Sequence, residues 1–151
     1  MKKGLFILII SVMLVLCACG SSYSAEFQKI YDSYIQDWEM WDDSMVELEM
    51  YYIAENYAAA CNATDLNTMP DQFAEAAAYP LATMSGSSKA AGVGRAAWDA
   101  IYMLYQNDMD AFKKNMDAVR SKFEEAVGMS IEDYLASTSE QDIYNTYKVP
   151  H

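Results

Sequence analysis

Histidine is almost absent from this chain, because the only one is His151, the last of the 151 residues. Hydrolytic triads and many zinc sites depend on an imidazole side chain. The sequence therefore offers no Ser-His-Asp or Cys-His arrangement, no His-Glu-x-x-His motif and no histidine that could act as a pH switch. We expect a non-catalytic chain without a cofactor or a metal centre. An enzyme that uses carboxylates alone stays as an alternative, and it would need these groups to converge in a closed pocket.

Basic residues are also scarce, with ten Lys and Arg against 22 Asp and Glu. Lys2 and Lys3 fall in the first 18 residues, which contain no acidic residue. The remainder therefore has eight basic and 22 acidic residues and a net charge of −14. Such a surface repels phosphate backbones, so we expect no binding of nucleic acid. If charge steers a partner, that partner is cationic.

Long hydrophobic runs are missing except for Leu5 to Leu16, which only Ser11 interrupts. This run is shorter than the roughly 20 apolar residues that span a bilayer. It follows two lysines and ends at small residues, which is the pattern of a secretory signal. The sequence therefore predicts a signal peptide over residues 1–18.

The end of this signal, Leu16-Cys17-Ala18-Cys19, resembles the bacterial lipobox, in which a branched apolar residue stands three places before an invariant cysteine. The resemblance implies diacylglyceryl transfer to the Cys19 thiol and cleavage after Ala18. Residues 19–24 would then be the lipidated cysteine and a short tether. Two acyl chains anchor a protein stably to a membrane. We therefore expect the chain on the extracytoplasmic face of a bacterial membrane, held there through the lipid on Cys19.

Cysteine is otherwise rare, and only Cys61 remains after Cys17 leaves with the signal and Cys19 takes lipid. No disulfide can then form within the mature chain. Cys61 follows three alanines in an expected helix. It could be a small buried apolar residue or the site of an intermolecular disulfide.

Alternation of apolar and polar residues, the signature of strands, is absent after the signal, so we predict an all-α fold. Two long helices are expected, from Ser24 or Ala25 to about Asn62 and from near Ser88 to Gly128, with a candidate break at Asn107-Asp108. Apolar residues in both step by four and three, as in a heptad seam. The seam residues are Phe27, Tyr31, Tyr34, Trp38, Trp41, Met45, Leu48 and Tyr52, and then Trp98, Tyr102, Tyr105, Met109, Phe112, Met116, Val119, Phe123 and Ala126. Two long helices that each carry such an apolar face indicate an antiparallel pair within a helical bundle.

Three capping signals predict short helices that cover the rest of this bundle. Thr68 with Asp71 would open a helix over residues 70–79, which Pro80 would end. Ser130 with Asp133 would open a helix over 131–136, and Ser139 with Asp142 one over 140–147. The three capping pairs are thus Thr68–Asp71, Ser130–Asp133 and Ser139–Asp142. We expect a single domain over residues 25–148 and a frayed tail over 149–151.

Acidic residues concentrate in the first long helix, where Glu26 to Glu55 contains nine carboxylates and one basic residue, Lys29. Like charges at this spacing repel one another. Four of them lie near one row of the helix: Asp32, Glu39, Asp43 and Glu47. This row could be a solvated face, a surface for a basic protein or peptide, or a site for a divalent cation.

Aromatic residues are abundant, with 12 Tyr, 5 Phe and 3 Trp. Aromatic stripes at heptad spacing usually form a core, but they can also line a groove for a ligand or partner. Tyr51 and Tyr57 leave the seam, so we add them to the acidic row as a candidate partner surface.

Together these features predict a lipid-anchored, non-catalytic helical module of a bacterial envelope that binds a basic protein or peptide. The alternative is a binder of a small ligand or divalent cation that is accessory to a transporter.

Overall fold

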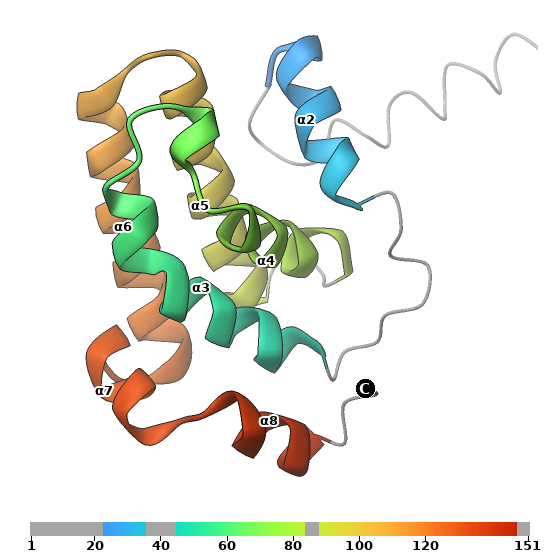
Figure 1. Cartoon of the computed structure of the whole chain (residues 1–151), viewed down its shortest axis with the longest axis vertical. Helices are drawn as coiled ribbons and strands as arrows, with labels where there is room; N and C mark the ends of the chain where they lie inside the picture. Colours follow the sequence, from blue (N-terminus) through green and yellow to red (C-terminus); the bar gives the residue numbers. More distant parts are fainter. Residues whose placement is uncertain (1–22, 36–44, 84–87, 148–151) are drawn as a thin grey trace, which may run out of the picture.

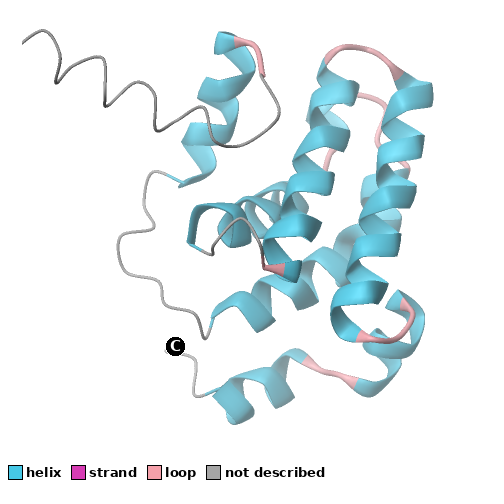
Figure 2. Ribbon diagram, turned by 180° about the vertical axis from the view of Figure 1, so that it is seen from behind, coloured by secondary structure: helices cyan, strands magenta, loops and turns pink. Residues whose placement is uncertain are grey.

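The computed structural model of this chain describes residues 23–35, 45–83 and 88–147. This part of the chain contains helices and no strand (Figures 1 and 2), which confirms the prediction of an all-α fold of packed helices. The elements are α2 (Ala25–Ile35), α3 (Met45–Cys61), the 3-10 helix η2 (Leu66–Thr68), α4 (Asp71–Thr83), α5 (Lys89–Tyr105), α6 (Met109–Val127), α7 (Ile131–Ser137) and α8 (Glu140–Tyr147). None of the helices described is both long and apolar enough to cross a membrane.

Helices α5 and α6 form an antiparallel hairpin, and α7 and α8 lie beyond its lower end (Figure 1). Helix α4 packs against α5, and α3 packs against α4. Helix α2 lies over α4 on one side, while α7 and α8 contact α3 at the other end of the hairpin. The short helices thus cover apolar surface that the hairpin leaves open.

The prediction of one continuous helix from Ser88 to Gly128 is wrong. Helix α5 ends at Tyr105, and the chain reverses at the candidate break. Asn107 adopts a left-handed conformation with φ of 61°, which asparagine tolerates better than most residues. The Asp108 side chain then accepts a hydrogen bond from the Ala111 N–H at 3.0 Å and begins α6. The heptad pattern runs across this turn because both arms of the hairpin bury a face.

The first long helix was expected from Ser24 or Ala25 to about Asn62. The structure describes its two ends as α2 and α3, and residues 36–44 lie outside the described residues. The predicted ends agree well, since α2 begins at Ala25 and α3 ends at Cys61. Helix α2 contacts α4, whereas α3 contacts α4, α7 and α8.

Two expectations about α4 are wrong. Pro80 does not end the helix but lies inside it, and the helix continues to Thr83. Pro80 is fully buried, so packing around it outweighs the loss of one helical hydrogen bond. Thr68 does not cap α4 with Asp71 but closes a capping box with Asp65 in η2. The Asp65 carboxylate accepts the Thr68 N–H at 3.1 Å, and the Thr68 hydroxyl accepts the Asp65 N–H at 3.1 Å.

The last two helices begin and end close to where the capping signals placed them. The Ser130 hydroxyl accepts the Asp133 N–H at 3.0 Å and begins α7. Ser139 and Asp142 bond each other reciprocally, with the Asp142 N–H donating to the Ser139 hydroxyl at 3.2 Å and the Ser139 N–H to the Asp142 carboxylate at 3.3 Å. Gly128 ends α6 with φ of 80°, a value that favours glycine. Local side-chain chemistry therefore fixes these boundaries.

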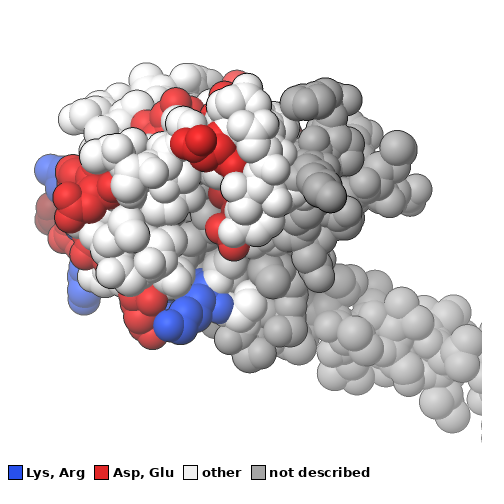
Figure 3. Space-filling model, turned by 90° about the horizontal axis from the view of Figure 1, so that it is seen from below, with Lys and Arg blue, Asp and Glu red and all other residues white. Residues whose placement is uncertain are grey.

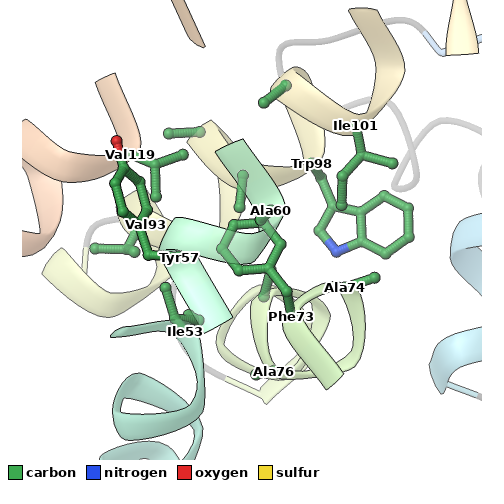
Figure 4. Packing of buried hydrophobic residues seen from close by; sticks show 14 of the residues in the cluster. Ile53, Tyr57, Ala60, Phe73, Ala74, Ala76, Val93, Trp98, Ile101 and Val119 are labelled. Atoms are coloured by element: carbon green, nitrogen blue, oxygen red, sulfur yellow. The ribbon is translucent and has the colours of Figure 1, made fainter. Parts of the chain in front are cut away.

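The core lies between α3, α4, α5 and α6 (Figure 4). Helix α4 supplies small side chains, among them Ala74 and Ala76, while α5 supplies the fully buried Trp98. At Gly94 the two helices approach so closely that a Cβ atom would lie 2.3 Å from the Ala77 carbonyl oxygen. Four aromatic rings surround the Trp98 region from α2 and α5: Phe27, Tyr31, Tyr34 and Tyr102. The aromatic seam of α2 is thus part of the core.

Candidate functional site

A half-open pocket of about 260 Å³ lies between α3, α4 and α8. Its α3 wall presents residues spaced three and four apart, so they share one face of the helix. The α4 wall presents two residues three apart, and α8 contributes one tyrosine. The lining residues are Met45, Leu48, Glu49 and Tyr52 of α3, Gln72 and Glu75 of α4, and Tyr144 of α8. We call this the acidic pocket.

Helix α8 forms one wall of the acidic pocket because its own apolar residue is anchored on α3. Ile143 is buried against Leu48 in a small cluster separate from the main core. The neighbouring Tyr144 is thereby held at the pocket wall. Docking of an eight-residue helix thus completes the site.

Glu49 is the buried charged residue of the described part of the chain, with 5% of its surface exposed. Burial, followed by the negative charge of Glu75, raises the pKa of the Glu49 carboxyl group to about 7. No hydrogen bond to this carboxyl group is formed by the residues that the structure describes. Within the described ranges, this carboxyl group thus has none of the donors that normally accompany buried charge. It is therefore the strongest candidate for contact with an external ligand.

Two tyrosines are fixed in position beside this carboxyl group. The Tyr52 hydroxyl donates a hydrogen bond to Glu140 of α8. Burial, followed by the hydrogen bonds to Glu140 and Tyr144, raises the pKa of Tyr52, so its hydroxyl stays neutral. The Asn56 amide donates to the Tyr52 carbonyl oxygen at 2.9 Å and to Gln72 at 3.2 Å, which holds the α4 wall in register. The rings thus belong to a preformed wall.

The surroundings of the acidic pocket carry charge of one sign. Helices α3, α4, α7 and α8 contain nine acidic residues and no Lys or Arg. Of the seven Lys and Arg in the described part, six lie on α5 and α6. Figure 3 views the α7–α8 end, where acidic side chains spread over the face and basic ones stay at its margin. A cation near this end meets an attractive field.

The convergence of Glu49 and Glu75 is also what a carboxylate-only enzyme would need, and a raised pKa suits a general acid. The pocket is smaller than the roughly 300–1,000 Å³ typical of small-molecule sites. Glu75 is exposed to water. These features suit the binding of one charged group better than the enclosure of a substrate.

The predicted acidic row is not assembled by the described residues. Asp32 lies exposed on α2, where it accepts a hydrogen bond from Gln28 at 2.9 Å. Glu47 lies on α3 and lines a different hollow, beside α5 and α6. Glu39, Asp43 and the predicted lipidation residue Cys19 lie outside the described residues. Tyr51 is half-buried on α3, and its hydroxyl donates to Glu55 at 3.4 Å.

Tyr57 is a core residue, so its assignment to a partner surface is wrong. It is 5% exposed, and its hydroxyl donates to the Met116 carbonyl oxygen at 2.8 Å. The Arg120 guanidinium lies over its ring at 5.0 Å and bonds the Glu132 carboxylate through two nitrogens at 2.9 Å each. Cys61 is half-buried next to it, and burial raises the pKa of its thiol. A residue that leaves the heptad seam can still face the core when a third helix packs there.

Glu49 and Glu75 were not singled out from the sequence, although a signal for Glu49 existed. It stands four residues after Met45 and four before Ile53, among apolar residues that face the bundle. A carboxylate at such a position is a buried one. Glu75 had no such signal, because its proximity to Glu49 depends on how α4 docks against α3.

Within the described ranges, no three His, Cys, Asp or Glu side chains are grouped so that they could hold a metal ion. Comparisons with protein families, with curated proteins and with solved structures find no match for this chain.

Proposed function

We propose that this chain is a lipid-anchored helical module on the extracytoplasmic face of a bacterial membrane, which binds a basic protein or peptide without catalysis. The anchoring rests on the lipobox-like Leu16-Cys17-Ala18-Cys19 and the signal before it. The binding rests on one observation above all, the acidic pocket with its buried Glu49, to which no residue of the described ranges donates a hydrogen bond.

The charge distribution supports a basic partner. Residues 19–151 have a net charge of −14, and the three helices that line the acidic pocket carry no basic residue. Opposite charges speed encounter and suppress wrong partners even where they add little affinity. An acidic or neutral partner would gain nothing from this arrangement.

The alternative function is binding of a small ligand or divalent cation, as an accessory to a transporter. Calcium in proteins takes six to eight oxygen ligands. The acidic pocket supplies two carboxyl groups and one amide oxygen, and no larger acidic group is present among the described residues. The arrangement therefore favours an organic cation over a metal ion.

Crosslinking in living cells followed by pull-down of the full-length chain tests this function. We expect one basic envelope protein or peptide to be enriched. Recovery of only bulk lipid and abundant envelope proteins under several growth conditions would contradict the proposal. Thermal shift with calcium and other divalent ions tests the alternative, because a ligand that binds the folded state raises the melting temperature.

A further inference from the structure

The Glu49 carboxyl group lies in the acidic pocket with 5% of its surface exposed. Among the described residues it receives no hydrogen bond, and the charge that acts on it is that of a second carboxylate, Glu75. Buried carboxylates are normally paired with a cation or with hydrogen-bond donors. The missing partner is thus a group that brings both positive charge and N–H donors.

We propose that the acidic pocket holds one ammonium or guanidinium group of the basic partner, carried by a lysine or arginine side chain. The group binds between the Glu49 and Glu75 carboxylates, and the Tyr52 and Tyr144 rings flank it. Its identification as a side chain rests on the function proposed above. Its identification as an organic cation rests on the pocket alone.

Elsewhere in this fold, a tyrosine ring and a carboxylate already hold a basic side chain of the chain itself. Arg120 lies over the Tyr57 ring at 5.0 Å and bonds the Glu132 carboxylate through both guanidinium nitrogens. One tyrosine ring and one carboxylate therefore already accommodate a basic side chain in this fold. Cation–π attraction adds to the charge-assisted hydrogen bonds in such an arrangement. The acidic pocket has the tyrosines and carboxylates but no basic residue among its lining residues.

The dimensions of the pocket suit the end of a side chain. Its volume of about 260 Å³ is below that of typical small-molecule sites. Met45 and Leu48 give the wall an apolar part, against which the methylene stem of a lysine or arginine packs. The open side leaves the backbone of the partner outside.

The cation binds the ionised form of Glu49, so binding depends on pH. Among the described residues, the titratable groups that line the pocket with Glu49 are Tyr52, which is bonded to Glu140, Glu75 on α4 and Tyr144 on α8. The pKa of Glu49 is about 7 in the unliganded chain. Binding therefore releases protons near neutral pH, and affinity falls as the pH drops below about 7.

Isothermal titration calorimetry of the full lipidated chain in detergent micelles tests the proposal. The probes are a blocked glycine-flanked lysine tripeptide, the same peptide with norleucine, and free butylamine. We expect the lysine peptide to bind, the norleucine peptide not to bind, and Glu49→Gln to weaken lysine binding roughly tenfold or more. Glu55→Gln is the matched control, since Glu55 is an exposed carboxylate on the same helix outside the pocket.

Each outcome separates this inference from the function on which it partly rests. Lysine-peptide binding that Glu49→Gln leaves unchanged overturns the pocket assignment and keeps the basic-peptide function. Butylamine binding that depends on Glu49, without peptide binding, supports the organic-cation site and overturns the peptide partner. Failure of both probes to bind the wild-type chain overturns both. Titration in buffers of different ionisation enthalpy adds a specific readout, because only a chain with Glu49 releases the proton.

Discussion

Replacement of Glu49 by glutamine should stabilise the folded chain at alkaline pH and have little effect in acid. In the structure, burial and the nearby Glu75 raise the pKa of Glu49 from its ordinary value of 4.5 to about 7. The folded chain therefore holds a proton that the unfolded chain has already lost between these values. Glutamine has the same shape as the protonated side chain but cannot ionise.

The magnitude follows from the two pKa values. Below about pH 4.5, Glu49 is protonated in both states and contributes no pH-dependent difference. As the pH rises through this value and then through about 7, the free energy of unfolding falls, because ionisation in the folded state is disfavoured. The cost reaches about 3 kcal/mol at about pH 8 and stays below about 1 kcal/mol at about pH 5. Glu49→Gln should recover up to about 3 kcal/mol at the higher pH.

Urea unfolding, followed by far-ultraviolet circular dichroism, measures the free energy of unfolding at each of the two pH values. Glu55→Gln serves as the control, because this exposed side chain should change stability by less than about 0.5 kcal/mol at either pH. An equal gain for Glu49→Gln at both pH values, or no gain at about pH 8, would refute the reasoning. The same substitution should weaken binding of a cation, so stability and binding would change in opposite directions.

Four further substitutions test the fold and the anchor. Gly94→Ala places a Cβ atom 2.3 Å from the Ala77 carbonyl oxygen and should cost about 1–3 kcal/mol in thermal or urea unfolding, whereas Gly92→Ala meets nothing within 4 Å and should stabilise by about 0.5–1 kcal/mol. Asp108→Ala removes the cap of α6 and should cost about 1 kcal/mol. Cys19→Ser should abolish fatty-acid labelling and release the chain from membranes, and labelling that persists would contradict the lipid anchor.

Features set by neighbouring residues were predictable from the sequence. The pairs Ser130–Asp133 and Ser139–Asp142 placed two helices correctly because capping is a local interaction. Gly128 ended α6 as expected, because a left-handed residue favours glycine.

Features set by packing between distant segments were not predictable. The heptad pattern of apolar residues continues across Asn107 although the helix ends there, because each arm of the hairpin buries one face. Pro80 was expected to end a helix, but its burial in the core keeps it inside one. The proximity of Glu49 to Glu75 depends on how two helices dock, and no spacing in the sequence encodes it.

One face of α4 lines the acidic pocket, and the small side chains on its core face let it pack close to α5. The position of α4, and with it the width of the pocket, therefore depends on this packing. This helix shows Gln72 and Glu75 to the pocket, while Ala76 and its neighbours face the core. Its distance from α5 is fixed where Gly94 leaves no room for a single methyl group. A close-packed core has little compressibility, so any added volume there must displace α4 as a rigid body. Substitutions deep in the interior would therefore alter the spacing between the two carboxylates without touching either of them.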